Sequence, residues 1–146
     1  MPLKPAHLAL LLAAVLATPA RAAGPEGNWL TEDRSGVIAI APCEAGLCGR
    51  IVGMSEPRRP DGSVSTDKQG HPMCGLTILH AAPDGPGRWS GEITNPDTGT
   101  AWHCTLSLDA AGHLRLRGYV LLPLFGQTQT WTRTAAPPRA DCAMTK

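Results

Sequence analysis

Apolar and polar side chains alternate along short runs of this chain, and most runs end at a group of turn-forming residues. In residues 100–108, Trp102, Cys104 and Leu106 fall on one face, and the residues between them are polar or charged. A period of two is typical of a β-strand with one buried face. The 16 glycines and 14 prolines supply the turns. The pattern therefore predicts an all-β fold.

Eight such runs follow one another, and the connections between most of them are short. The runs are residues 27–31, 37–41, 48–54, 74–80, 88–94, 100–108, 113–120 and 127–133. Closing the sheet on itself would bury its apolar face and remove its free edges. We predict an eight-stranded antiparallel up-and-down barrel, with the polar segment 55–72 as a long loop over one mouth. A two-sheet sandwich is the alternative.

The first 22 residues have the three parts of a secretory signal. Lys4 gives a basic start, residues 8–16 are apolar, and the small residues around Ala22 suit cleavage. The apolar run is much shorter than the roughly 20 residues of a membrane-spanning helix. We therefore expect a signal peptide over 1–22 and one domain over 23–146. Its core would span about 26–134 and be followed by an irregular tail, and the protein would be periplasmic or secreted.

Charge and motifs argue against several classes of function. The net charge is +1, and no basic stripe interleaved with aromatic residues marks a nucleic-acid surface. No familiar catalytic motif occurs, and the acidic residues fall mostly in predicted turns. The soft ligands His71, Met73 and Cys74 follow no recognised metal spacing. We predict no cofactor, no metal and no catalytic residues.

Five cysteines follow the predicted cleavage site, which favours disulfides in an exported protein. Cys43 and Cys48 flank a predicted hairpin turn, so we expect them to be linked. A metal site there is the weaker alternative, because neither has a neighbouring histidine in the sequence and no C-x-x-C occurs. Cys104 either stays a buried thiol or pairs with Cys74 or Cys142, with Cys74 the favoured member.

Four tryptophans accompany only one phenylalanine and one tyrosine. Trp29, Trp89 and Trp102 are predicted to face inward, either to fill the barrel or to line a cavity. Gly91 is expected to leave space inside. Leu121, Leu122, Leu124 and Phe125 form an apolar cluster near one mouth. The candidate ligand-binding residues are Trp89, Trp102, Leu124 and Phe125.

Both ends of the strand pattern carry a recognisable motif. Gly27-Asn28-Trp29 opens the first run, and Trp131-Thr132-Arg133 closes the last. This pair resembles the calycin arrangement, which includes lipocalins. The resemblance implies that Trp29 plugs one end of the barrel and that Arg133 stacks over its indole, a cation–π contact. Arg133 would also cap backbone carbonyls at that end.

The region from Gly27 to Arg133 is also similar to the exported bacterial family labelled domain of unknown function 2147. The matching segments include Ile40-Ala41-Pro42-Cys43, Leu47-Cys48-Gly49-Arg50, Cys74-Gly75-Leu76-Thr77 and Asn95-Pro96-Asp97-Thr98-Gly99. The resemblance implies an exported lipocalin-like barrel and no particular activity. Tyr119 departs from the family, whose members often carry cysteine there, so cysteine pairing does not transfer.

Three classes of function remain. The first is non-catalytic binding of a small apolar ligand inside the barrel. The second is a structural or protein-interaction module with a filled barrel, whose partner would be another envelope protein. The third, an enzyme, lacks any paired acid and base or oriented nucleophile in the sequence.

Overall fold

Every alternating run forms a strand in the computed structural model of the protein, which describes residues 24–120, 126–135 and 139–144. The strands are β1 (Gly27–Leu30), β2 (Gly36–Cys43), β3 (Gly46–Met54), β4 (Thr77–Pro83), β5 (Arg88–Thr94), β6 (Ala101–Leu108), β7 (Leu114–Tyr119) and β8 (Gln127–Arg133). Within these residues, no helix is long and apolar enough to cross a membrane.

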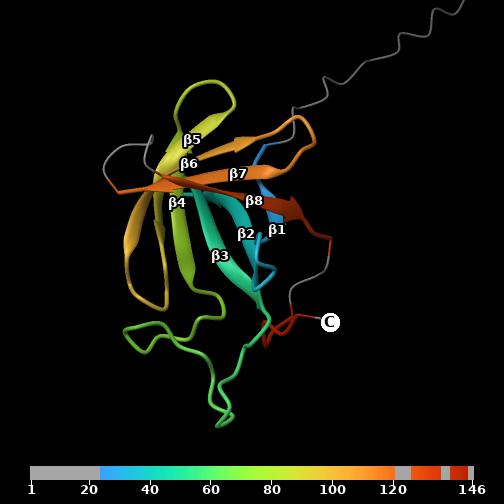
Figure 1. Ribbon diagram of the computed structural model, residues 1–146, viewed down its shortest axis with the longest axis vertical. Helices are drawn as coiled ribbons and strands as arrows, with labels where there is room; N and C mark the ends of the chain where they lie inside the picture. Colours follow the sequence, from blue (N-terminus) through green and yellow to red (C-terminus); the bar gives the residue numbers. More distant parts are fainter. Residues whose placement is uncertain (1–23, 121–125, 136–138, 145–146) are drawn as a thin grey trace, which may run out of the picture.

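The strands form a closed barrel in sequence order, with each strand antiparallel to the next (Figure 1). The predicted barrel is therefore confirmed, and the sandwich alternative is wrong. Closure between β1 and β8 rests on two register pairs, Trp29 with Arg133 and Leu30 with Thr132. Just beyond them, the Glu32 carboxylate accepts a 2.6 Å hydrogen bond from the Thr130 backbone N–H. The Glu32 side chain thus extends the hydrogen bonding between β1 and β8 past the end of the short strand β1.

Strand β4 lies three residues later in the chain than the sequence predicted. It runs from Thr77 to Pro83, whereas the expected strand covered residues 74–80. The register between β3 and β4 shifts at Gly49/Arg50, which marks a bulge. Pro83 ends the strand, a position where its missing N–H costs no central hydrogen bond. The bulge and the end position of Pro83 account for the displaced boundaries.

The long connection between β3 and β4 extends beyond the barrel (Figure 1). It has internal order, because isolated bridges join Arg58 to Val64 and Thr66 to Pro72. The C-terminal segment returns to the same end of the barrel, where Ala143 forms a parallel bridge with Met54. The tail that the sequence predicted as irregular is therefore tied to the end of β3.

The two ends of the barrel differ in how they are filled. Trp29, Leu106 and Leu114 are fully buried, and Trp131 is 2% exposed. These side chains lie toward the end that carries the β2–β3, β4–β5 and β6–β7 turns, which we call the closed end. The opposite end carries the β1–β2 turn, the long β3–β4 loop and the β5–β6 turn, and we call it the open end.

Candidate functional site: a cavity at the open end

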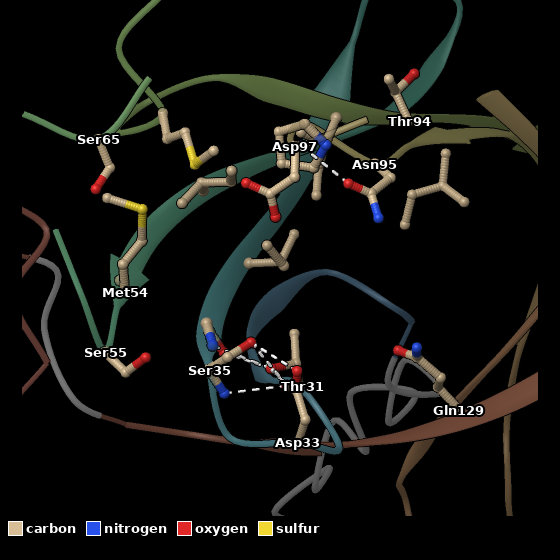
Figure 2. A pocket seen from close by; sticks show the side chains of 18 of the residues that line it. Thr31, Asp33, Ser35, Met54, Ser55, Ser65, Thr94, Asn95, Asp97 and Gln129 are labelled. Carbon is tan, nitrogen blue, oxygen red and sulfur yellow. Dashed lines mark hydrogen bonds between the residues drawn. The ribbon is translucent and has the colours of Figure 1, made fainter. Parts of the chain in front are cut away.

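A cavity of about 990 Å³ enters the barrel from the open end. Its lining comes from the inner faces of the strands and from the β1–β2, β3–β4 and β5–β6 connections. Figure 2 shows polar side chains of the β1–β2 and β5–β6 turns facing each other across this space. The volume lies in the range of small-molecule sites, about 300–1,000 Å³.

The deeper wall of the cavity is hydrocarbon. It is formed by branched side chains on β2, β3, β4, β5 and β7. These are Ile38, Ile51, Ile78, Ile93 and Leu116. Inward alternation places the side chains of β2, β3, β5 and β7 there, because residues two apart share a face. Ile78 does not follow the alternation of β4, and it is the extra residue of the bulge opposite Gly49/Arg50. This part of the site can remove apolar surface from water but offers few hydrogen bonds.

The β1–β2 turn forms one polar side of the mouth. The Asp33 carboxylate accepts hydrogen bonds from the Thr31 hydroxyl at 2.7 Å and from the Ser35 backbone N–H at 3.0 Å. These contacts, the Thr31 hydroxyl first, hold the pKa of Asp33 below its ordinary value although partial burial opposes them. Asp33 is therefore a fixed negative charge at neutral pH.

The β5–β6 turn forms the facing side. The Asn95 side-chain oxygen accepts hydrogen bonds from the backbone N–H of Asp97 at 2.9 Å and of Thr98 at 3.2 Å. This Asx turn holds Asp97 at the rim, as Figure 2 shows. The sequence placed both acidic residues in turns, and the structure adds that the two turns line one mouth.

The long loop and β8 complete the rim. Glu56 and Arg59 line the cavity, and the Arg59 guanidinium donates a 2.5 Å hydrogen bond to the Thr66 hydroxyl. Gln129 lines the opposite wall, and its side-chain oxygen accepts from the Trp131 indole at 2.8 Å. Three carboxylates, those of Asp33, Glu56 and Asp97, thus share the rim with the guanidinium of Arg59.

The predicted ligand residues do not all meet at this cavity. Trp102 lines it and is 40% exposed, so this inward tryptophan stands at the mouth rather than in the core. Trp89 packs half-buried against the core and does not line the cavity. Leu124 and Phe125 lie outside the described residues.

Gly91 does not leave space inside the barrel, contrary to the prediction. A Cβ atom there would collide with the backbone oxygen of His80 and come within 2.7 Å of the Ala81 Cα. The glycine instead lets β5 approach β4 closely. The space in this barrel comes from the open end, where the inward side chains are branched aliphatics.

The two ends of the sequence motif meet at the closed end. The Arg133 guanidinium carbon lies 4.3 Å from the centre of the Trp29 ring. Its nitrogens donate to the backbone oxygens of Glu26 at 2.7 Å and Gly24 at 2.6 Å. A Cβ on Gly27 would lie 2.7 Å from Arg133 Nη1, so the glycine of the motif makes room for the guanidinium. The geometry matches what the calycin resemblance implied.

Comparison with known proteins agrees with this architecture. Residues 27–133 match the family described as "Uncharacterized protein conserved in bacteria (DUF2147)". The chain belongs to this family. No curated protein matches it. The DUF2147 barrel is also similar to the solved structure of protein HP1028 from Helicobacter pylori, described as belonging to the lipocalin family. Identity is 14%, the TM-score is 0.56, and the match covers 75% of this chain and 82% of the other. That likeness establishes a lipocalin-like fold.

Four of the five cysteines of this DUF2147 protein are linked. One disulfide joins Cys43 to Cys48, the pair expected from the hairpin. The other joins Cys74 to Cys142. Cys104 is free and fully buried, so the buried thiol is the correct one of the alternatives left open, and Cys104 pairs with neither Cys74 nor Cys142. Cys74 lies in the β3–β4 loop, within reach of the C-terminal segment, whereas Cys104 points into the core.

Cys104 is not a ready nucleophile in this DUF2147 barrel. Burial in the core, and secondarily the negative charge of Glu92, raise the pKa of its thiol to about 12. A thiolate is the reactive form, and this side chain stays protonated at neutral pH. Cys104 therefore packs as a small apolar residue.

Two features of the molecule escaped the sequence reasoning. Trp131, which the sequence left unassigned, is a fourth inward tryptophan in the core. His80 lies beside the first disulfide, with its Nδ1 atom 3.4 Å from the Cys48 sulfur. Neither Cys43 nor Cys48 has a histidine close to it in the sequence, but the fold brings His80 next to Cys48. The β3–β4 register, which pairs Cys48 with His80, was the missing information.

Proposed function

We propose that this protein binds a small ligand with an apolar body, without catalysis, in the cavity at the open end of the barrel. The observation that carries the proposal is the cavity of about 990 Å³ with an aliphatic wall and a polar rim. An apolar concavity with a few placed polar groups is the usual form of a small-molecule site. The lipocalin-like fold supports the same conclusion as an analogy.

The side chains at the rim indicate which polar groups the ligand should carry. Asp33, Glu56 and Asp97 are hydrogen-bond acceptors when ionised, and Arg59 is already bonded to Thr66. A ligand that buries its hydrocarbon part against Ile51 and Ile93 would place its other end among these carboxylates. We therefore expect that end to carry hydrogen-bond donors or a positive charge.

We also propose that the protein works outside the cytoplasm after removal of residues 1–22. The two disulfides support this location, because such bonds persist in oxidising compartments. N-terminal sequencing of the protein recovered from the periplasm or medium tests it. Recovery of the uncleaved chain in the cytoplasm would contradict it.

A cavity-filling variant tests the binding site directly. Ile93 lines the cavity, while its neighbour Glu92 is exposed on the outer face of the same strand. Ile93→Trp should abolish binding of a neutral apolar fluorophore such as N-phenylnaphthylamine, and Glu92→Trp should leave binding unchanged. Fluorescence titration of the wild type and both variants measures this.

Native mass spectrometry of the protein purified from its own cells then identifies the ligand. A co-purified small molecule that is absent from Ile93→Trp would support the proposal. Equal fluorophore binding by Ile93→Trp and the wild type would place the ligand elsewhere. Failure of the wild type to bind any apolar probe would favour the alternative, an interaction module that acts through its outer surface.

A further inference from the structure

A second group of chemically active side chains lies on the outer surface at the closed end, away from the cavity. The sulfurs of Cys43 and Cys48 and a ring nitrogen of His80 all lie within 4.8 Å of one another. His80 is exposed and the two cysteines are half-buried. All three line a surface hollow of about 530 Å³ beside the β2–β3 hairpin.

Strand register brings these three residues together. Cys48 pairs with Ala41 on β2 and with His80 on β4, so Cys48 and His80 are direct cross-strand neighbours on one face. Cys43 lies two residues beyond Ala41 on β2 and is therefore the diagonal neighbour of Cys48. Its Cα atom is 5.7 Å from that of Cys48. The backbone ladder holds this arrangement without help from the sulfur–sulfur bond.

The hairpin is also fixed against β4. A Cβ on Gly46 would collide with the backbone oxygen of Ala81, so glycine permits the hairpin to lie on the neighbouring strand. Ala81 follows His80 directly in the sequence. The imidazole and the two cysteines therefore sit on a rigid platform, as a metal site requires.

We propose that reduction of the Cys43–Cys48 disulfide converts this platform into a binding site for a thiophilic metal ion of the zinc class, with Cys43, Cys48 and His80 as ligands. In a tetrahedral zinc site, bond lengths of about 2.3 Å to sulfur and 2.0 Å to nitrogen place those two atoms about 3.5 Å apart. The Cys48 sulfur and His80 Nδ1 lie 3.4 Å apart before any metal is bound. Three protein ligands leave a fourth position for water or another molecule.

The oxidised form lacks this site, because the sulfur–sulfur bond consumes both thiolates. An external dithiol is the reductant. One of its thiolates attacks a protein sulfur, its second thiol completes the exchange, and the dithiol leaves as a cyclic disulfide. The protein sulfurs receive two electrons and two protons in total. The metal ion then replaces the two thiol protons, which pass to solvent.

The two disulfides differ in their fitness for this chemistry. At the other disulfide, Cys74 is half-buried as well, but Cys142 is only 3% exposed, so one of the two sulfurs of that bond is closed to an attacking thiolate. Thiol exchange needs access to a sulfur. Cys43 and Cys48 are both half-buried and both line the surface hollow beside the hairpin. Reduction should therefore be faster at Cys43–Cys48, where both sulfurs are accessible.

Metal titration of the intact exported protein tests the site. The probes are Zn²⁺, measured by competition with a chromophoric chelator, and Co²⁺, whose spectrum reports thiolate bonds and tetrahedral geometry. After reduction with a phosphine, the wild type should bind one ion per chain with a thiolate charge-transfer band. The oxidised protein should lack that band.

Variants locate the ligands. His80→Gln should lower the affinity of the reduced protein by about 100-fold or more, because even changes around metal ligands cost 10–100-fold. His103→Gln is the matched control, since His103 is an exposed histidine on β6 of the same barrel. It should leave binding unchanged. The double variant Cys43→Ser/Cys48→Ser should lose the charge-transfer band while Cys74 and Cys142 remain available.

Several outcomes overturn the proposal. The site is refuted if the reduced wild type binds no metal, or if His80→Gln binds as tightly as the wild type. If Cys43→Ser/Cys48→Ser binds metal as tightly as the wild type, the other cysteines are the ligands. Equal metal binding by the oxidised and the reduced protein would show that binding does not require reduction of the disulfide. Circular dichroism of each variant separates these outcomes from misfolding. None of them bears on the cavity at the open end.

Discussion

The closed and open ends of this barrel are built from the same eight strands but bury their side chains differently. At the closed end Trp29 is fully buried and Trp131 is 2% exposed, and Arg133 covers the indole of Trp29. At the open end Trp102 is 40% exposed beside a cavity of about 990 Å³. Tryptophans on the same inner face therefore fill one end and stand at the mouth of the other.

This difference separates stability from binding along the barrel axis. Large aromatic side chains plug the closed end, so substitutions there create voids in a packed core. The open end carries branched aliphatics and polar turns, which leave room and supply hydrogen bonds. Truncation of an inward side chain should therefore cost most stability at the closed end, whereas ligand affinity should respond most strongly to changes at the open end.

A pair of tryptophan variants gives the largest expected contrast. Trp29→Ala should cost about 3–5 kcal/mol in the free energy of unfolding, because it removes a fully buried indole. Trp102→Ala should cost about 1 kcal/mol or less, since its side chain is partly solvated at the rim. Urea unfolding measures both losses. Equal losses of unfolding free energy would mean that the two ends do not differ in how their tryptophans stabilise the barrel.

The two disulfides provide the next contrast, with the larger effect now at the open end. Cys74 and Cys142 are separated by 68 residues, whereas Cys43 and Cys48 are separated by five. Loop-closure entropy gives about 4 kcal/mol for the first bond and about 2 kcal/mol for the second. Serine double variants of each pair, unfolded without reductant, test this order. A larger loss for Cys43→Ser/Cys48→Ser would contradict it.

Arg133 tests the closure itself. Arg133→Ala should cost about 1–3 kcal/mol, through the lost stacking on Trp29 and the two uncapped carbonyl groups. Arg115 is the control. It is an exposed arginine whose Nη1 donates a 2.7 Å hydrogen bond to the Thr130 hydroxyl on β8. Arg115→Ala should cost about 0.5 kcal/mol or less. Thermal and urea unfolding of both variants should agree, and similar losses would mean that the Trp29 contact adds nothing.

The inner faces and the closed end follow from local sequence. Alternation in residues 100–108 correctly predicts that Cys104 and Leu106 point inward and are fully buried. The glycine of the Gly27-Asn28-Trp29 motif also has a structural reason, because Gly27 leaves room for the Arg133 side chain. The alternation of inward and outward side chains is a property of a single strand and does not depend on which strands lie beside it. The structure therefore shows the alternation that the sequence predicts.

Contacts that depend on register could not be predicted in the same way. The pairing of Cys48 with His80 crosses the long β3–β4 loop and follows a bulge at Gly49/Arg50, so the sequence alone does not align the two residues. The bond from Cys74 to Cys142 likewise depends on where the C-terminal segment returns. The open cavity depends on the long β3–β4 loop, whose residues line part of its rim. Each is a long-range outcome of folding.

The smallest expected effect compares two aspartates, one at each end. Asp33 lies at the open mouth, and Asp109 lies in the β6–β7 turn at the closed end. The pKa of each is held below its ordinary value, by the Thr31 hydroxyl for Asp33 and by the His113 backbone N–H for Asp109. NMR titration of the free protein should find both carboxyl groups below the ordinary value of about 4.

A lowered pKa in the folded state fixes the sign of the pH dependence. Each carboxylate contributes stability above the pKa of the unfolded chain, and that contribution is lost as pH falls through the lower folded pKa. Asp33→Asn and Asp109→Asn should each lose less stability than the wild type between about pH 5 and pH 2. Urea unfolding across this range checks the prediction, and an unchanged slope in both variants would contradict it.

Ligand binding should separate the two aspartates. Asp33 lines the cavity, so an apolar molecule seated there removes water from its carboxylate and raises its pKa relative to the free protein. Asp109 lies at the other end and does not line that cavity, so its titration should not move. Repeating the NMR titration with saturating fluorophore measures both shifts in one experiment. An equal shift at both aspartates would mean that the probe acts on the whole barrel. A shift at Asp109 alone would mean that binding occurs at the closed end, and the division between the two ends would then be wrong.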